Sequence, residues 1–374
     1  MQRIKELIYE KLSNDSKFLP IVEKVFGGER LVREEGMLLY QEAELPLLGL
    51  LAEVVRRRIN GTQVTFNRNF HFEPTNICMK NCAFCSYKRR FNEEGAWEEG
   101  IEELRETIKK YKDKKVTEVH ITGGVHPDRG LDYYCDMVRV IKEEMPELHV
   151  KAFSAVEIEA ICKISKVDFK TGLMALKEAG LGSIPGGGAE IFDEEVRKQI
   201  SPDKATSEEW LDIHETAHGL GMKTNATMLY GLIEDYSHRL DHMERLRSLQ
   251  DKTDGFNTFI PLKFRRYNNA FSHVEESTTT EDLRNYAISR IYVDNIPHLK
   301  AYWPMIGKEV AQLSLSYGVD DLDGTIDDST KIYSMAGAVQ NPSSTTQELV
   351  GMIHDAGKTA AERDTLYNII ERFE

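Results

Sequence analysis

The sequence predicts an α/β protein, a (β/α)8 barrel of the TIM type with an N-terminal helical extension. Three observations predict this fold. Short β-rich runs alternate with longer stretches of helical period from about residue 61 onward. Glycine, polar and aromatic residues gather directly after each run, where the active sites of such barrels lie. The chain has 374 residues, more than the roughly 250 that one such barrel needs.

The elements follow in chain order. Residues 1–60 have apolar residues at helical spacing, as in Leu47, Leu48 and Leu51, and form the predicted extension. The barrel is placed at residues 61–330, and residues 331–374 are expected to form a C-terminal helical segment packed on it. An open barrel of six units is the alternative, because the last two strand patterns are the weakest. Strands are expected near residues 64–73, 116–122, 149–155, 182–185, 223–230, 256–262, 297–303 and 312–317, with helices such as 100–111, 131–145 and 208–220 between them.

Composition excludes several classes of protein. The formal net charge of −14 repels phosphate backbones, so a nucleic-acid partner is not expected. No apolar stretch approaches the ~18 residues of a membrane span, and residues 1–7 lack the apolar segment of a signal peptide. Five cysteines are too few for a disulfide scaffold, and Cys135 and Cys162 fall in helix-like stretches where buried, inert thiols are expected. The sequence therefore predicts a cytoplasmic protein.

Three of the five cysteines fall within eight residues, in the pattern Cys78-x-x-x-Cys82-x-x-Cys85. Thiolates are soft ligands that suit iron–sulfur clusters and zinc. Three ligands leave one iron of a [4Fe-4S] cluster without a protein ligand, and radical S-adenosylmethionine (SAM) chemistry uses that vacancy. Structural zinc is the alternative, but it needs a fourth ligand, and His71 lies on a strand far upstream of the loop.

A second motif points to a different enzyme class. Residues 214–218 read His-Glu-Thr-Ala-His, which matches the H-E-x-x-H motif of zinc proteases. Position 224 holds Thr224 instead of a third histidine, so only Glu234 or Glu244 could complete the site. This helix precedes a predicted strand and is expected on the outer ring of the barrel. A zinc protease is kept as the alternative from another class.

With these residues in hand, the chain resembles the radical SAM enzymes of the menaquinone (futalosine) branch, most closely the aminofutalosine synthase family. The resemblance runs from about residue 30 to near the C-terminus. The cysteine motif is common to a very large superfamily, whereas the whole set of matching stretches is far more selective. These stretches are HFEPTN (71–76), CAFCSY (82–87), GGVHP (123–127), residues 184–192, NATMLYG (225–231) and FIPL (259–262).

The resemblance implies a role for each matching residue. Cys78, Cys82 and Cys85 would bind the [4Fe-4S] cluster. Phe84 and Tyr87 lie where the superfamily packs the adenine of SAM. Gly123 and Gly124 resemble the glycine pair whose backbone meets the methionine amino group, although Val125 replaces the acidic residue often found third. The residues of the fifth-strand motif that line the adenine would be Thr227, Leu229, Tyr230, Gly231 and Glu234.

Two further glutamates, Glu157 and Glu190, are implied contacts of the SAM ribose hydroxyls. A carboxylate can accept a hydrogen bond from such a hydroxyl. The alternative for both is a solvated loop charge or a partner of a helix N-terminus, where an acidic residue is favourable in any case.

The resemblance also implies the reaction. The substrate would be 3-[(1-carboxyvinyl)oxy]benzoate, a small aromatic dicarboxylate. The 5′-deoxyadenosyl group of SAM would add to its vinyl ether carbon, and rearrangement with loss of the carboxylate as bicarbonate would give aminodeoxyfutalosine. An electron donor such as flavodoxin or ferredoxin is the implied partner. Dehypoxanthine futalosine cyclase and the deazaflavin-forming synthase are the rivals within the superfamily.

Basic residues at strand ends are candidates for the substrate carboxylates. Lys263, Arg265 and Arg266 follow the sixth strand, and Arg68 and His71 lie on the first. Arginine pairs with carboxylate through two parallel hydrogen bonds, so Arg265 is the first choice. The alternative is a solvated basic loop. The candidates for proton transfer are His126 and His273.

Overall fold

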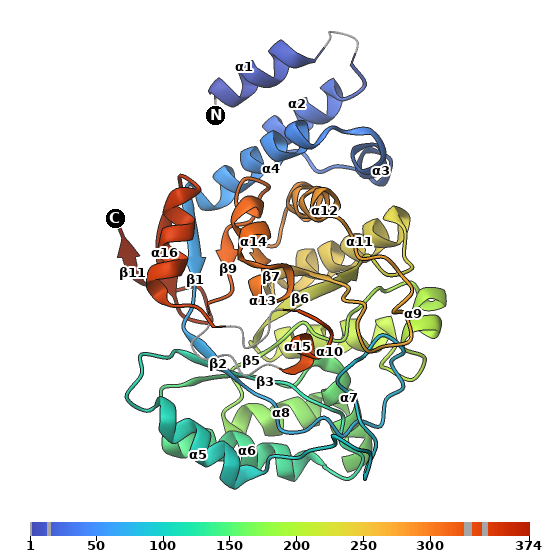
Figure 1. Cartoon of the computed structure of the whole chain (residues 1–374), viewed down its shortest axis with the longest axis vertical. Helices are drawn as coiled ribbons and strands as arrows, with labels where there is room; N and C mark the ends of the chain where they lie inside the picture. The colour runs from blue at the N-terminus through green and yellow to red at the C-terminus, as the bar shows by residue number, and fades with distance from the viewer. Residues whose placement is uncertain (1, 13–15, 325–330, 339–342) are drawn as a thin grey trace.

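The computed structural model describes residues 2–12, 16–324, 331–338 and 343–374, and its eleven strands form one curled sheet (Figure 1). The strand order is β11-β10-β1-β9-β8-β7-β6-β5-β4-β3-β2. All pairings are parallel except that of β10 with β11. The strands are β1 (Gln63–Phe66), β2 (Asn69–Phe72), β3 (Glu118–Ile121), β4 (His149–Ala152), β5 (Ser183–Ile184), β6 (Lys223–Tyr230), β7 (Phe256–Lys263), β8 (His298–Ala301), β9 (Asp321–Leu322), β10 (Thr359–Arg363) and β11 (Ile369–Phe373).

One run of chain, residues 63–72, belongs to both ends of this sheet. Its first half, β1, pairs with β9 and β10, whereas its second half, β2, pairs with β3. Only two residues separate β1 from β2, so the sheet must curl until its ends meet at this run. This curling confirms the predicted α/β barrel class.

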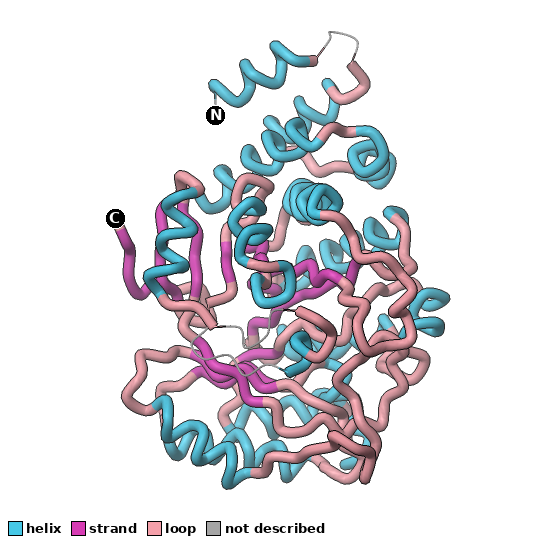
Figure 2. Tube along the Cα trace, viewed as in Figure 1, coloured by secondary structure: helices cyan, strands magenta, loops and turns pink. Residues whose placement is uncertain are grey.

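Helices cover the outside of the sheet because parallel neighbours require crossover connections (Figure 2). Local signals place their ends: Asp168 accepts a hydrogen bond from the Thr171 amide at the start of one helix, and Gly180 ends it in a left-handed conformation. The helices are α1 (Gln2–Lys11), α2 (Leu19–Gly27), α3 (Arg33–Glu42), α4 (Leu45–Asn60), α5 (Ile101–Tyr111), α6 (Leu131–Glu144), α7 (Ala155–Ser165), α8 (Phe169–Ala179), α9 (Glu194–Ile200), α10 (Ser207–Gly219), α11 (Tyr236–Thr253), α12 (Thr279–Tyr292), α13 (Trp303–Ile306), α14 (Lys308–Ser314), α15 (Lys331–Ser334) and α16 (Thr346–Asp355).

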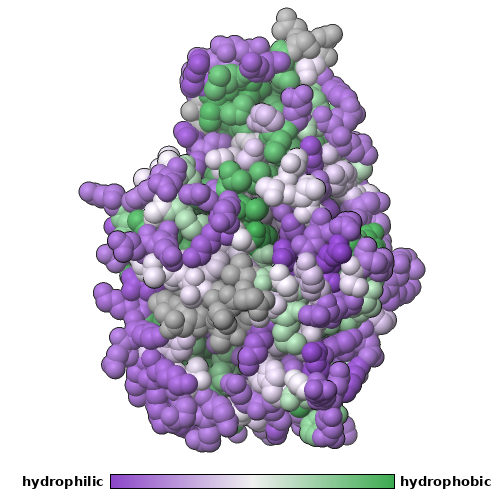
Figure 3. Space-filling view, viewed as in Figure 1, coloured by the Kyte–Doolittle hydropathy of each residue, from purple (hydrophilic) through white to green (hydrophobic). Residues whose placement is uncertain are grey.

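The N-terminal helices pack on the outer ring of the barrel. Helix α4 lies against α12, and α3 lies against α11 and α12. The Tyr40 hydroxyl donates to Asn285 at 2.7 Å, and its ring stacks on Tyr236. Apolar side chains show at the surface over this extension in Figure 3. None of the helices in the described ranges has the length and hydropathy that a bilayer crossing requires.

The last predicted strand, 312–317, is wrong. Its first half, residues 312–314, belongs to helix α14 and its second half is a turn, and the eighth barrel strand is β9, at Asp321–Leu322. Its alternating Leu-Ser-Leu-Ser letters suggest a strand, but Ala311 and Leu315 are the buried residues while Leu313 is half exposed. A spacing of four residues places both buried side chains on one helical face.

The C-terminal region also differs from the expected helical segment. It contains α15 and α16, but β10 joins the free side of β1 and β11 folds back on β10 as a hairpin. The letters Thr-Ala-Ala-Glu-Arg of β10 favour a helix locally. Without β10, the backbone groups on the side of β1 that faces away from β9 would lack hydrogen-bond partners. Pairing with these groups favours a strand, and it outweighs the local helix propensity. The predicted boundary at residue 330 lies outside the described residues.

Candidate active site

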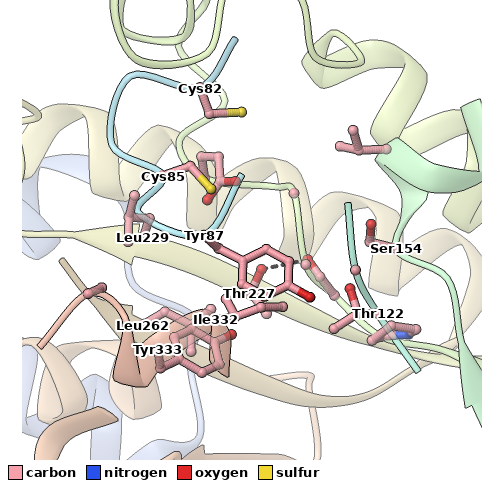
Figure 4. A pocket seen from close by; sticks show the side chains of 18 of the residues that line it. Cys82, Cys85, Tyr87, Thr122, Ser154, Thr227, Leu229, Leu262, Ile332 and Tyr333 are labelled. Atoms are coloured by element: carbon pink, nitrogen blue, oxygen red, sulfur yellow. Dashed lines mark hydrogen bonds between the residues drawn. The ribbon is translucent and has the colours of Figure 1, made fainter. Parts of the chain in front are cut away.

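A cavity of about 250 Å³ lies at the carboxyl ends of the barrel strands. The loop after β2, which carries the three cysteines, forms one wall, and the glycine-containing turns after β3 and β5 form others. Inward side chains of six strands form its floor, and residues 332–336 cover it. Figure 4 shows Cys82, Cys85, Tyr87, Thr227 and Tyr333 around this space. Segments distant in sequence therefore converge on one composite site.

Backbone hydrogen bonds hold the cysteine loop in place. The Met79 amide donates to the carbonyl of Val125 (2.8 Å), which ties the loop to the turn after β3. The Ala83 amide donates to the carbonyl of Ile200 (2.7 Å), the last residue of α9. The loop is thus anchored at two points between its cysteines.

The three thiols suit an iron–sulfur cluster better than a single ion. Cys82 is buried and Cys78 and Cys85 are half-buried, and all five cysteines of the chain are free of disulfides. Burial raises the pKa of Cys78 and that of Cys82, the latter to about 11, although the Lys204 ammonium opposes the shift. The described residues contain no three Cys, His, Asp or Glu side chains gathered for one metal ion. A [4Fe-4S] cluster needs no such convergence, because its three thiolates bind three different irons.

Gly123 and Gly124 allow the cysteine loop to approach β3. A Cβ at Gly124 would lie 2.3 Å from the carbonyl oxygen of Ile77, and one at Gly123 would lie 2.9 Å from that of Thr75. Only glycine tolerates backbone this close. Both glycines also line the cavity. Their first role is therefore to pack the loop that carries the cysteines, and their backbone is available to a ligand.

Phe84 and Tyr87 form an aromatic wall of the cavity. The Tyr87 hydroxyl donates to the Thr75 carbonyl at 3.0 Å, and its ring meets Trp97 edge-on. The Lys204 ammonium lies 5.1 Å from the centre of the Phe84 ring. Both rings are held in fixed orientations, as a binding surface for a flat ligand requires.

Glu157 and Glu190 both line the cavity, and both already have partners. Glu157 accepts hydrogen bonds from Thr122, from the Gly123 amide and from both the amide and the hydroxyl of Ser154. It thereby caps the start of α7 and joins it to the end of β3. Burial raises the pKa of Glu157, and these hydrogen bonds oppose the shift. Glu190 pairs with Lys204. The structure thus shows the helix-start role for Glu157.

Tyr230 and Gly231, both predicted to contact the cofactor, lie outside the cavity lining. Alternation along β6 turns Asn225, Thr227 and Leu229 toward the cavity, so Tyr230 points to the other face. There its hydroxyl donates to Asp282 at 3.0 Å. The Gly231 amide donates to Glu234, which in turn pairs with Arg239. The residues of the fifth-strand motif are present in β6, but only every second one faces the cavity.

Only some of the predicted substrate-binding residues line the cavity. Arg265 and His71 line the cavity. However, the Arg265 guanidinium is engaged by the Gly337 carbonyl (2.8 Å) and by Glu276 (3.1 Å). Lys263 is buried against Asp282 at 2.8 Å, and Arg68 pairs with Glu362 of β10. Neither Lys263 nor Arg68 lies in the cavity lining, so the structure does not bring these two residues to the site.

The two histidines proposed for proton transfer lie outside the cavity lining. His126 is buried behind the turn after β3, where its Nδ1 accepts from the Asp128 amide at 3.1 Å, and burial lowers its pKa. His273 is exposed on the loop after β7. Geometry gives neither residue access to a bound substrate.

Sequence reasoning missed the polar floor of the cavity. His120, Lys151, Lys300 and Asp323 line it, although barrel interiors are usually filled by branched apolar residues. A signal was present: residues 149–153 read His-Val-Lys-Ala-Phe and residues 298–302 read His-Leu-Lys-Ala-Tyr. A lysine within a buried strand indicates an inward polar position.

The H-E-x-x-H segment is part of the hydrophobic core of the outer ring. His214 Nδ1 and His218 Nε2 both contact the Thr224 hydroxyl, at 2.9 and 2.8 Å. Burial lowers the pKa of both histidines, that of His218 to about 4. Glu215 faces outward and pairs with Lys252 at 2.5 Å. Both histidines are thus engaged by one threonine hydroxyl, and Glu215 faces away from them, which removes the basis of the zinc-protease alternative.

Known proteins match both halves of the chain. The radical SAM superfamily matches residues 72–246, and the CofH/MqnC C-terminal region matches residues 253–374. Aminodeoxyfutalosine synthase of Thermus thermophilus is 47% identical over 94% of this chain and 96% of its own length. That of Streptomyces coelicolor is 42% identical over 94% of each. Cyclic dehypoxanthine futalosine synthase of Streptomyces coelicolor is 37% identical over 93% of this chain and 88% of its own length.

Solved structures share the fold. Methylornithine synthase superposes with a TM-score of 0.72 over 90% of this chain and 96% of that one, at 17% identity. The FeFe-hydrogenase maturase HydG from Carboxydothermus hydrogenoformans gives 0.73 over 98% and 84%, at 18% identity. A barrel with three thiols at its strand ends defines the class, a radical SAM enzyme. More particularly, the chain belongs to the radical SAM family that contains aminodeoxyfutalosine synthase, which confirms the resemblance seen in the sequence.

Proposed function

We propose that the chain is an aminodeoxyfutalosine synthase, which joins the 5′-deoxyadenosyl group of SAM to 3-[(1-carboxyvinyl)oxy]benzoate. One observation carries the proposal. Full-length identity is 47% and 42% to two aminodeoxyfutalosine synthases, but 37% and 35% to two cyclic dehypoxanthine futalosine synthases. The cavity supports it, since thiols at one end and polar side chains at the other suit SAM and a second, anionic ligand.

Cys78, Cys82 and Cys85 are the residues that would hold a [4Fe-4S] cluster. When bound, the cluster supplies the electron that splits SAM into methionine and the reactive adenosyl group. The chain's own residues orient and enclose the reactants. Phe84 and Tyr87 offer a wall to the adenine, and residues 332–336 cover the cavity, which keeps water from the reaction.

The proposal includes an electron source and a compartment. A small reductant protein such as flavodoxin or ferredoxin would deliver the electron. A reducing cytoplasm would be the location, in agreement with five cysteines that are all free of disulfides.

The test is anaerobic reconstitution with iron and sulfide, followed by incubation with SAM, a reductant and 3-[(1-carboxyvinyl)oxy]benzoate. Mass spectrometry should find an adduct that retains adenine, together with free methionine and little 5′-deoxyadenosine. Free 5′-deoxyadenosine without the adduct would overturn this substrate and direct the same assay to the substrate of dehypoxanthine futalosine cyclase.

A matched pair of variants tests the cluster ligands. Cys85→Ala should lose iron, sulfide and the absorption at roughly 400 nm that such clusters show. Cys135→Ala removes a thiol that is buried in α6, and it should keep the cluster. Equal iron content in the two variants would contradict the assignment of the thiols.

A further inference from the structure

Three basic side chains lie at one level of the barrel interior. His71, His120 and Lys151 are direct register partners on β2, β3 and β4. Side chains of register partners in a parallel sheet point to the same face, and all three line the cavity. Lys300 of β8 lines the same cavity. Its segment repeats the His-x-Lys-Ala-aromatic pattern of the Lys151 segment.

Lys151, Lys300 and His120 keep hydrogen-bond donors unused. The Lys151 ammonium contacts Glu118 at 2.5 Å, which engages one of its three N–H groups. The Lys300 ammonium donates one long hydrogen bond to Asp323, at 3.4 Å, and lies 3.5 Å from Asp321, both longer than the ~2.8 Å of a good charge-assisted bond. The Nε2 atom of His120 is buried without a hydrogen-bond partner among the described residues.

The acids beside Lys300 do not use up its donors. Asp321, which lies outside the cavity lining, accepts from Nε and Nη2 of the Arg363 guanidinium, at 2.8 and 2.6 Å. Lys151 and Lys300 are 5% and 2% exposed, so water cannot satisfy them freely. A buried polar group without a partner costs free energy, which an incoming acceptor would recover. A carboxylate, with two oxygens and a charge, fits this set of donors.

The chemistry of the proposed substrate decides which carboxylate this is. Its vinyl ether group carries one carboxylate, on the carbon next to the methylene that forms the new bond, and this group must face SAM, at the cysteine end of the cavity. The rigid ring then carries the second carboxylate toward the floor. Resting on the proposed function, we infer that Lys300, Lys151 and His120 bind the benzoate carboxylate, the one retained in the product. Arg265 has its guanidinium engaged by Gly337 and Glu276.

The test compares the full substrate with 2-phenoxyacrylate, which lacks only the ring carboxylate. Wild-type enzyme should favour the full substrate in kcat/KM by about 10- to 100-fold, as expected for charge-assisted hydrogen bonds. Lys300→Gln should lose most of this preference, mainly through the KM of the full substrate.

The matched control is Lys358→Gln. Lys358 is also a lysine paired with an acid, Glu53 at 2.8 Å, and its side chain is 8% exposed, but it lies outside the cavity lining. This variant should keep the wild-type preference. If Lys300→Gln fails to fold, His120→Phe keeps the ring and removes the donor, and it should reduce the preference in the same direction.

The outcomes separate the two proposals. A Lys300→Gln or His120→Phe enzyme that favours the full substrate as strongly as wild type overturns the floor assignment. If wild type forms no adduct from either compound, the proposed function falls instead. Calorimetry with 3-methoxybenzoate, which carries only the ring carboxylate, then measures directly how tightly the floor residues bind this carboxylate. Binding should weaken at least about tenfold in Lys300→Gln, and equal or undetectable binding in both proteins overturns the inference.

Discussion

At the scale of single residues, the approach of the cysteine loop to β3 depends on missing side chains. Gly124→Ala would place a methyl group 2.3 Å from the Ile77 carbonyl oxygen, so the loop must move. We expect this variant to lose about 1–3 kcal/mol of stability through overpacking and to bind little iron on reconstitution. Denaturant unfolding and iron analysis would measure both effects.

Gly351→Ala is the control for this substitution. An added Cβ at Gly351, in α16, meets nothing within 4 Å. The variant should keep its cluster and gain up to ~1 kcal/mol from helix propensity. Normal iron content in Gly124→Ala would show that the loop tolerates displacement.

A second residue-scale prediction concerns Glu157. Its carboxylate accepts four hydrogen bonds at the start of α7, so Glu157→Gln should cost about 1–3 kcal/mol of unfolding free energy. The KM for SAM should change little, because the acceptor positions are already occupied. A large rise in this KM with unchanged stability would instead support the ribose contact that the resemblance implies. Urea unfolding and SAM titration distinguish the two results.

At the scale of elements, the short helix α15 covers the cavity because its first backbone amides are hydrogen-bonded to a residue at the end of β2. Glu73, directly after β2, accepts hydrogen bonds from the Lys331 and Ile332 amides at 3.0 and 3.2 Å. Ile332 and Tyr333 then line the cavity. Glu73→Gln removes the negative charge that stabilises the N-terminus of α15, so this helix should leave the cavity more often. We expect a several-fold higher fraction of SAM to end as free 5′-deoxyadenosine.

Glu348→Gln provides the comparison for the cover. Glu348 also accepts from a backbone amide at a helix start, that of Thr345 before α16, but it lies outside the cavity lining. Product partition in this variant should match wild type. The same partition in Glu73→Gln would mean that α15 does not protect the reaction.

At the scale of the whole molecule, Glu53 joins the two ends of the chain. It lies on α4 and pairs with Arg56 and Arg57 of that helix and with Lys358 before β10. Burial raises the pKa of Glu53, but the hydrogen bonds from Arg56, Lys358 and Arg57 lower it more, to about 2 from an ordinary 4.5. The folded state therefore binds this proton more weakly than the unfolded state does.

The sign of the pH dependence follows. Stability from Glu53 is fully present above pH 4.5 and is lost as the pH falls toward 2. Glu53→Gln should be less stable than wild type by about 2–3 kcal/mol at neutral pH, and the difference should shrink on acidification. Urea unfolding of cluster-free protein across this range would measure it. Glu106→Gln, at an exposed pair with Lys109, should track wild type at every pH; a constant deficit for Glu53→Gln would contradict the pKa argument.

Much of the fold and part of the site follow from local pattern. The spacing of Cys78, Cys82 and Cys85 predicts their chemistry because three thiols on one short loop can reach one cluster in any fold. Alternating strand and helix patterns predict the barrel class, because hydrophobic period reports local conformation. The pair Gly123 and Gly124 indicates close backbone approach for the same local reason.

The tertiary structure alone decided which of these side chains meet. Closure at residues 63–72 and the register of β2, β3 and β4 bring His71, His120 and Lys151 to one level. The alternation of side chains along β6 turns Tyr230 away from the cavity. Arg265 is a suitable carboxylate ligand by residue type. However, its guanidinium already pairs with Glu276 and donates to the carbonyl of Gly337, which lies far along the chain. Short-range spacing sets what a residue can do. Long-range pairing sets its neighbours, because strand partners come from segments whose distance in sequence carries no signal of their contact.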